Sequence, residues 1–218
     1  MKKTILSVLA IVSIIAACTT NGEKATTKDA EKVVVQNSES SVAFNKIMPD
    51  SKVDWRASHL GGVKPRYGKI SLSSADVTIS GNKISAAKIV MDMKSFTVES
   101  FEDAESNNKL KNHLQSEDFF KVDSFPSSTF ELTSIADATG DYNSTVTGNL
   151  NIMETTKSIT FKANIVASES NVSIKSEDFV VDRADWGLVY HAEGSEGVPV
   201  DYLISDDVGF TIQVNLEK

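Results

Sequence analysis

Few side chains in this sequence can carry out acid–base, nucleophilic or metal chemistry, and they are widely spaced. The chain has one cysteine, Cys18, and three histidines, His59, His113 and His191. A metal site needs several ligands that converge, and neither a His-x-x-x-His nor a Cys-x-x-Cys pair occurs. The Gly-x-Ser-x-Gly nucleophile motif and the glycine-rich phosphate loop are also missing. We therefore expect no metal site, no cofactor and no enzymatic activity.

Cys18 has the sequence context of a lipid attachment site. The chain opens with Met1–Lys3, and residues 5–16 follow without a charge, which is too short for the roughly 20 apolar residues of a membrane span. A basic start, a short apolar run and small residues are typical of a secretory signal. The cysteine after Ala16-Ala17 resembles the lipobox of bacterial lipoproteins, although it also fits an ordinary secretory signal with a chance cysteine. We predict a signal peptide over residues 1–17 and a lipid anchor on Cys18.

The charge of the chain excludes some partners. Its formal net charge is -8, and it becomes more negative when Lys2 and Lys3 leave with the signal. Nucleic-acid backbones are neutralised by Lys and Arg, so no nucleic-acid partner is expected. Membrane attachment is then expected through the lipid alone. Thr19 differs from the Asp that retains some Gram-negative lipoproteins in the inner membrane, so we expect the bacterial cell envelope, at the outer membrane.

The rest of the chain divides into a polar segment and a strand-rich domain. Residues 18–40 are polar and lack aromatic side chains, which predicts a flexible tether reaching roughly 25 Å on average. Residues 41–218 show mainly a period of two, in which apolar and polar residues alternate, as in antiparallel strands with one buried face. Expected strands cover 53–58, 68–79, 84–95, 129–135, 146–152, 159–167, 172–182 and 208–216.

One segment departs from this pattern. Residues 103–115 are good helix formers, with Leu110 and Leu114 four apart on one face. We therefore expect an all-β fold, an antiparallel β-barrel of about eight strands with one α-helix inserted, because closure removes exposed sheet edges. The helix would cross one side of the barrel or plug its end. A barrel of this size is either filled by side chains or holds one small ligand.

Three groups of residues together resemble the YceI-like family of exported lipid-binding proteins. The first is His59-Leu60-Gly61 followed by Tyr67-Gly68. The others are 112–120 with 125–130, and 148–152 with 156–161; Arg183-Ala184-Asp185-Trp186-Gly187 is similar to a further family run. The resemblance extends from about residue 41 to the end, and it implies a lipocalin-like barrel with an apolar interior. It also implies an amphiphilic isoprenoid ligand, a polyprenyl lipid or quinone with its tail inside, and a homodimer.

Several residues are candidates for binding such a ligand. The apolar ones that we expect to point inward are Trp55, Phe130, Leu150, Ile152, Phe161, Phe179 and Phe210. Each also fits an ordinary filled core. His59 and Arg183 have the chemistry to hold a polar head group, but His59 also fits a hydrogen bond to its turn and Arg183 a structural pair with Asp185. The irregular segment 188–206 is expected to shape one mouth of the barrel.

These observations predict a membrane-tethered carrier for an isoprenoid lipid or quinone, held in an apolar barrel. Three alternatives stay open at this point. One is a structural or envelope-stress lipoprotein with a filled barrel and a surface contact. Another is a redox accessory that presents a quinone to a membrane partner. The third is an enzyme with its site in the loops from Trp186 to Tyr202, although no catalytic group of residues is visible there.

Overall fold

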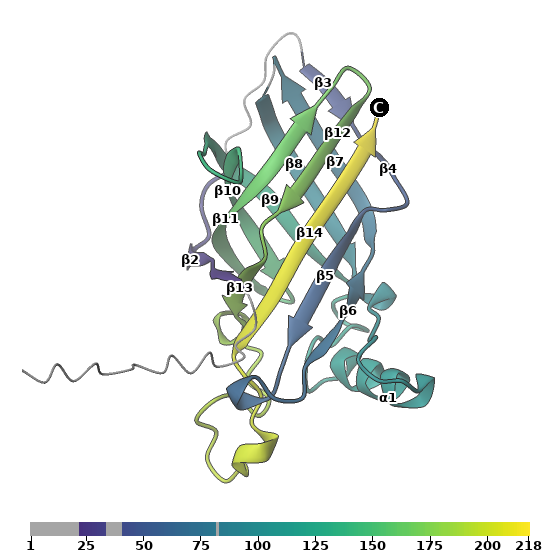
Figure 1. Cartoon of the computed structure of the whole chain (residues 1–218), viewed down its shortest axis with the longest axis vertical. Coiled ribbons are helices and arrows are strands. Elements are labelled where there is room, and N and C mark those ends of the chain that lie inside the picture. The colour runs from purple at the N-terminus through teal and green to yellow at the C-terminus, as the bar shows by residue number, and fades with distance from the viewer. Residues whose placement is uncertain (1–21, 34–40, 82) are drawn as a thin grey trace, which may run out of the picture.

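The computed structural model describes residues 22–33, 41–81 and 83–218. The predicted signal peptide, the predicted anchor Cys18 and part of the predicted tether lie outside these residues. The described chain forms one 14-stranded sheet and one α-helix, α1 (Ala104–Gln115). Figure 1 shows the sheet curving along the length of the molecule, with α1 near one end. None of the described helices is long and apolar enough to cross a bilayer.

The strands follow one another along the chain with mostly short connections. Their bounds are β1 (Glu23–Lys24), β2 (Thr26–Asp29), β3 (Ser41–Phe44), β4 (Lys46–Ile47), β5 (Lys52–Ala57), β6 (Arg66–Ile70), β7 (Leu72–Ser80), β8 (Lys83–Asp92), β9 (Ser127–Asp137), β10 (Ser144–Ile152), β11 (Thr155–Ala167), β12 (Asn171–Ser176), β13 (Phe179–Asp182) and β14 (Asp207–Glu217). Four short 3-10 helices accompany them: η1 (Leu60–Gly62), η2 (Met93–Ser95), η3 (Arg183–Trp186) and η4 (Val200–Tyr202).

An antiparallel ladder forms the main part of the sheet. It runs from β14 through β12, β11, β10, β9 and β8 to β7. At the other side of β14, strands β4 and β5 pair with it, and β5 also pairs with β6. The expected antiparallel, predominantly β architecture with one α-helix is therefore confirmed.

Some predicted strands are shorter than the sequence pattern indicated. The predicted strand 84–95 ends at Asp92, because the Asp92 side chain accepts a hydrogen bond from the Lys94 N–H and caps η2. The predicted strand 68–79 is divided at Ser71, between β6 and β7. The predicted strand 172–182 is likewise divided into β12 and β13. The alternation is locally broken near two of these interruptions, where Ser73 and Ser74 are both exposed and Phe179, Val180 and Val181 are all buried.

Part of the predicted flexible tether is instead bound to the sheet. Strand β1 pairs in parallel with β13, and the Ala25 N–H donates to the carbonyl of Val180 at 2.8 Å. Strand β2 pairs with residues 157–160 of β11, beyond the stretch of β11 that β12 covers. The prediction of a tether was wrong for residues 23–29. These residues pair mainly through their backbone, so their polar side chains stay exposed and give no sign of the pairing.

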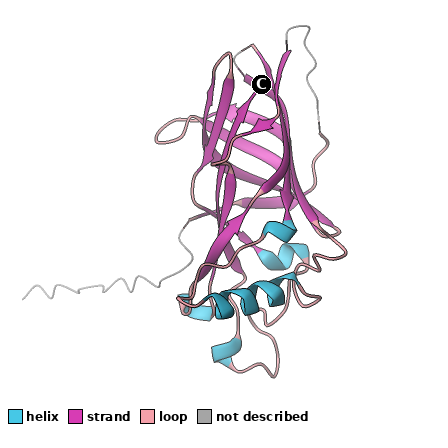
Figure 2. Ribbon diagram, turned by 90° about the vertical axis from the view of Figure 1, so that its right-hand side faces the viewer, coloured by secondary structure: helices cyan, strands magenta, loops and turns pink. Residues whose placement is uncertain are grey.

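The interior of the sheet holds the apolar core, and α1 lies across one end of it. Asp103 caps the start of α1 by accepting a hydrogen bond from the Ser106 N–H. Leu110 and Leu114 pack against the core, as their spacing indicated. Figure 2 shows α1 and the short helices together at this end. The helix therefore covers an end of the fold, which was one of the two placements expected from the sequence.

Candidate ligand-binding cavity

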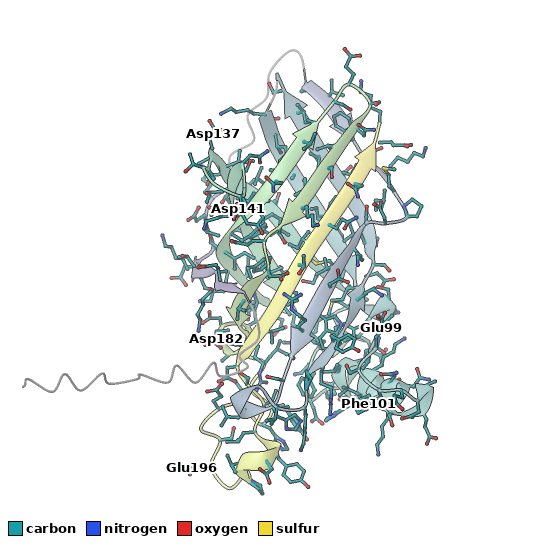
Figure 3. All side chains as sticks on the ribbon, in the orientation of Figure 1. Glu99, Phe101, Asp137, Asp141, Asp182 and Glu196 are labelled. Atoms are coloured by element: carbon teal, nitrogen blue, oxygen red, sulfur yellow. The ribbon has the colours of Figure 1, made fainter. Side chains whose placement is uncertain are left out.

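The interior is not completely filled by side chains. A cavity of about 340 Å³ lies between the sheet and the end that α1 covers. Its wall comes from β5, β6, β8, β9, β10, β11, β13 and β14. Its end comes from α1, the segment after α1 and the segment 188–206, here called the entrance loop. Phe101 beside α1 and Glu196 in the entrance loop lie at this end of the molecule, away from Asp137 (Figure 3).

The predicted tail-binding residues are largely brought together in this wall. The cavity is lined by Trp55, Phe130, Leu150, Ile152, Phe179 and Phe210. Phe161 is not part of the lining, although it is buried. Its ring stacks on that of Phe179, with 4.7 Å between centroids, and lies 5.7 Å from that of Phe130. Phe161 points to the same interior as Ile159, which is two positions earlier in β11 and lines the cavity; it supports two lining rings by packing beside them in the core.

Trp55 is fixed in the wall by polar and aromatic contacts. Its indole Nε1–H donates to the carbonyl of Thr97 at 3.1 Å, and its ring stacks on Phe96 at 4.8 Å. The segment that carries these partners crosses Gly68 at very short range. A Cβ at Gly68 would lie 1.9 Å from the Thr97 oxygen, so only glycine fits there. This gives a packing reason for the Tyr67-Gly68 pair seen in the sequence.

Sequence reasoning missed the residues that close the end of the cavity. Phe119 and Phe120 follow α1 and line the cavity together with Leu110, Leu114 and Tyr190. The ring of Tyr190 lies 5.0 Å from Phe119 and 5.2 Å from His113. This contact joins the entrance loop to α1. The leucine spacing and the paired phenylalanines were visible in the sequence, but their position over the cavity was not.

Arg183 is buried at the base of the entrance loop. Its guanidinium has five N–H groups, and all five have protein partners. They donate to the carbonyls of Leu188, Tyr190, Ile204 and Ser205, at 2.7–3.2 Å, and to the Asp206 carboxylate at 3.1 Å. Although Arg183 borders the cavity, it has no N–H left for a head group. Its predicted role in head-group binding is therefore replaced by a structural role, and its ion-pair partner is Asp206 rather than Asp185.

Burial shifts the pKa of each member of this ion pair in the direction that favours its neutral form. Desolvation lowers the pKa of Arg183 and raises the pKa of Asp206, while the opposite charge of each partner works against the shift. An arginine remains protonated across the physiological range, and the 3.1 Å contact satisfies the carboxylate. We therefore treat the pair as charged, holding the two ends of the entrance loop together.

His59 lines the cavity where β5 leads into the entrance region. Its Nδ1 lies 3.0 Å from the carbonyl oxygen of Asp201, so Nδ1 carries the proton and donates. Desolvation lowers the pKa of His59, which favours the neutral ring with Nε2 as a hydrogen-bond acceptor. The hydrogen bond expected to the local turn is instead made to the entrance loop.

Ser58 is a polar lining residue that the sequence gave no reason to select. It is only 6% exposed, and its Oγ has no hydrogen-bond partner among the described residues. A buried hydroxyl without a partner costs free energy, so it often marks a missing partner. Ser58 and His59 thus place one hydroxyl and one imidazole in a lining that is otherwise largely apolar.

Comparison with known protein families identifies the family of this chain. A model of the YceI-like domain matches residues 34–216. The chain belongs to the YceI-like family. Strands β1 and β2 lie before the matched region.

A metal centre is not part of this site. Among the described residues, no group of three or more His, Cys, Asp or Glu is arranged to hold a metal ion.

Curated relatives of this YceI-like chain come from pseudomonads. A UPF0312 protein of Pseudomonas putida is 33% identical over 111 residues, covering 51% of this chain and 54% of the relative. A UPF0312 protein of Pseudomonas aeruginosa is 27% identical over 139 residues, covering 58% and 69%. The chain thus spans about half the length of the first of these relatives.

Two solved structures share the fold. Burkholderia cenocepacia BcnA superposes with a TM-score of 0.56 at 18% identity, covering 76% of this chain and 95% of BcnA. A polyisoprenoid binding domain from Saccharophagus degradans superposes with a TM-score of 0.55 at 14% identity, covering 80% and 97%. At these identities the similarity concerns the fold.

Proposed function

We propose that this protein binds an amphiphilic isoprenoid lipid, a polyprenyl lipid or a quinone, and carries it within the bacterial cell envelope. The observation that carries the proposal is the apolar cavity of about 340 Å³. An engineered apolar cavity of about 150 Å³ in another protein stays dry and binds benzene. A larger apolar space in a natural fold is suited to a hydrocarbon tail.

We also infer that the sheet closes into the eight-stranded barrel expected from the sequence. Support comes from β5, which pairs with both β14 and β6, and from β6, which continues through Ser71 into β7. Leaving out the short strands β1 and β2, and counting β3–β5, β6–β7 and β12–β13 each as one interrupted strand, gives eight strands around the cavity. A closed barrel would shield a bound tail from water on all sides.

The apolar lining is sufficient to drive binding. Burial of a methylene contributes about 0.8 kcal/mol, so ten methylenes contribute about 8 kcal/mol before the costs of ordering. The polar end of the ligand would then lie near Ser58 and His59. The Ser58 hydroxyl can donate to a head-group oxygen, while Nε2 of His59 can accept from a head-group hydroxyl. A polyprenol hydroxyl satisfies both contacts, and a quinone carbonyl satisfies the contact with Ser58.

Several other observations agree with an isoprenoid ligand and an envelope location. The similar domain from Saccharophagus degradans is described as polyisoprenoid binding. The lipobox-like Ala16-Ala17-Cys18 run supports attachment by a lipid, and we place the anchored protein at the outer membrane. A homodimer remains part of the proposal through the family resemblance.

The proposal is tested by identifying what the cavity holds. The full chain is purified from a bacterial envelope in mild detergent, extracted with organic solvent and analysed by mass spectrometry. We expect a stoichiometric isoprenoid, and we expect the cavity-filling variant Leu150→Trp to lose it while Val166→Trp, on an exposed strand position, retains it. If neither extracted nor added isoprenoids bind the wild-type chain, the alternative of an interaction lipoprotein without a lipid ligand replaces this one.

A further inference from the structure

Exposed apolar side chains gather at the cavity end of the molecule. Seven large apolar residues in the described part of the chain are exposed, and five of them belong to residues 63–67 or to the entrance loop. Val63, Val200 and Tyr202, here called the apolar tip, are 53%, 66% and 60% exposed. Such residues have no packing role in the fold, so their grouping needs another explanation.

The three residues of the apolar tip lie on two loops that are hydrogen-bonded to each other. The Leu60 N–H donates to the carbonyl of Leu203 at 2.9 Å. Lys64 Nζ donates to the carbonyl of Asp201 at 3.4 Å, and His59 pairs with Ile204 as an isolated bridge. These contacts hold η1 and η4 side by side, so Val63 belongs to the same surface as Val200 and Tyr202.

The apolar tip also borders the cavity. Tyr202 lines the cavity while more than half of it is exposed, and its neighbours Ile204 and His59 line the cavity too. Figure 1 shows η4 within the yellow loop that projects beyond the ends of the strands. The exposed apolar surface and the way into the cavity are therefore at one place.

We propose that the apolar tip docks on the surface of a lipid bilayer, with the cavity entrance turned towards the membrane. Valine and tyrosine side chains suit this position, because tyrosine favours the boundary between apolar and aqueous surroundings. The entrance loop contains four carboxylates, Glu193, Glu196, Asp201 and Asp206, and no Lys or Arg. On the neighbouring loop, Lys64 and Arg66 lie beside Val63. Four carboxylates thus stand against two cations on the two loops, so the surface that fits is one of neutral, zwitterionic lipids rather than anionic ones.

The start of the described chain supports this partner. The Glu23 N–H donates to the carbonyl of Asp178, and Lys24 forms an ion pair with Asp207, the residue that directly follows the entrance loop. Cys18 lies four positions before Gly22, and four extended residues reach at most about 14 Å. If Cys18 carries the lipid that we propose, the bilayer lies within short reach of this part of the sheet.

The first experiment measures which part of the anchored protein enters the bilayer. The full chain has no cysteine other than Cys18, so a fluorophore on Val200→Cys or on Val166→Cys labels one site once Cys18 is acylated. Val166 is a matched control, because it is 65% exposed but lies in β11. With phosphatidylcholine vesicles that contain a lipid-borne quencher, we expect quenching at position 200 and none at 166. Equal quenching at both positions, or none at 200, would overturn the proposal.

The second experiment measures the consequence for lipid uptake, and it rests on the proposed function. A double change, Val63→Glu with Val200→Glu, at two tip residues that do not line the cavity, should slow transfer of a fluorescent isoprenoid from phosphatidylcholine vesicles by about tenfold or more, because two apolar side chains no longer enter the bilayer. Binding of the same isoprenoid from detergent should not change, and Val166→Glu should alter neither.

These two readouts separate failure of docking from failure of the cavity. Unchanged transfer in the double variant would overturn docking while leaving the carrier function intact. Absence of isoprenoid binding in the wild-type chain would overturn the carrier function, whereas the quenching experiment would still decide the docking. Adding anionic phosphatidylglycerol should weaken quenching at position 200, and added salt should restore it.

Discussion

The two ends of this molecule close in different ways. At the end away from α1, strands and short hairpins meet, and large side chains such as Phe44 and Leu216 are 1% and 0% exposed. At the other end, a helix and a long loop close the fold, and the cavity lies beneath them. The sheet supplies continuous backbone hydrogen bonds, whereas the entrance loop depends on side chains. The cavity therefore lies where α1 and the entrance loop cover the interior, because their side chains fill the space less completely than the side chains of paired strands do.

The largest effect should come from the side chain that organises the entrance loop. Replacing Arg183 by Met leaves four carbonyls and the Asp206 carboxylate without their donor. We expect a loss of about 3–5 kcal/mol in the free energy of unfolding, because four carbonyls lose their donor and the partly buried Asp206 carboxylate loses its cation. Chemical denaturation measures this loss. Arg66→Met, at a less buried arginine, is the control, and an equal loss in both would contradict the special role of Arg183.

A matched pair of leucine substitutions compares the two ends directly. Leu216→Ala in the filled end should cost about 3–5 kcal/mol, because a fully packed site leaves a new void. Leu150→Ala in the cavity wall should cost less, since Leu150 already borders empty space and has fewer contacts to lose. Urea denaturation of both variants gives the difference. Equal costs would mean that Leu150 has no empty space beside it in solution, because side chains or a ligand fill the cavity.

A smaller change in stability is expected at Ser58, whose hydroxyl lines the cavity without a hydrogen-bond partner among the described residues. Ser58→Ala should raise the stability of the ligand-free protein by about 1 kcal/mol, because it removes a buried polar group that has no partner. It should also weaken binding of an oxygen-headed isoprenoid by roughly fivefold or more, while binding of a hydrocarbon of equal length is unchanged. Titration calorimetry with the two ligands checks this contrast. A loss of affinity for both would show that Ser58 contributes only to packing.

The smallest effect is a pH dependence at the entrance. The pKa of His59 is lowered in the folded protein from its ordinary value of 6.5, chiefly by desolvation. The unfolded chain therefore binds a proton on His59 more readily than the folded protein does. Protonation of His59 thus favours unfolding, and the free energy of unfolding falls as the pH falls through 6.5 towards the folded pKa. Unfolding free energies measured from about pH 8 to pH 5 should fall more steeply in the wild type than in His59→Gln. Parallel curves would rule out this contribution.

Much of the fold and of the cavity wall could be predicted from the sequence. The period of two identified the strands and the face of each that is buried, so Trp55, Phe130 and Leu150 were correctly expected to point inward. The helix-forming residues of segment 103–115 and the spacing of Leu110 and Leu114 identified α1. These are local signals, because a single strand or helix must bury one face whatever its neighbours are.

The remaining features depend on contacts between segments far apart in the chain. The polar residues 23–29 join the sheet through backbone pairing, which leaves no mark in their side chains. Arg183 could be assigned to a head group or to Asp185 from its neighbours in sequence, but its partners come from residues 188–206 as they fold back over it. Ser58 is unremarkable until its surroundings are known. Phe161 follows the alternation of β11 and faces the interior, yet it packs against Phe130 and Phe179 and does not line the cavity.

The sequence by itself therefore determined which apolar residues of the main strands and of α1 face inward, and which family the chain resembles. Only the tertiary structure decided whether the buried face meets another side chain or an empty space. The reason is that a cavity is the difference between the volume that the strands enclose and the volume that their side chains fill. That difference depends on all strands, α1 and the entrance loop at once, and no single segment contains it.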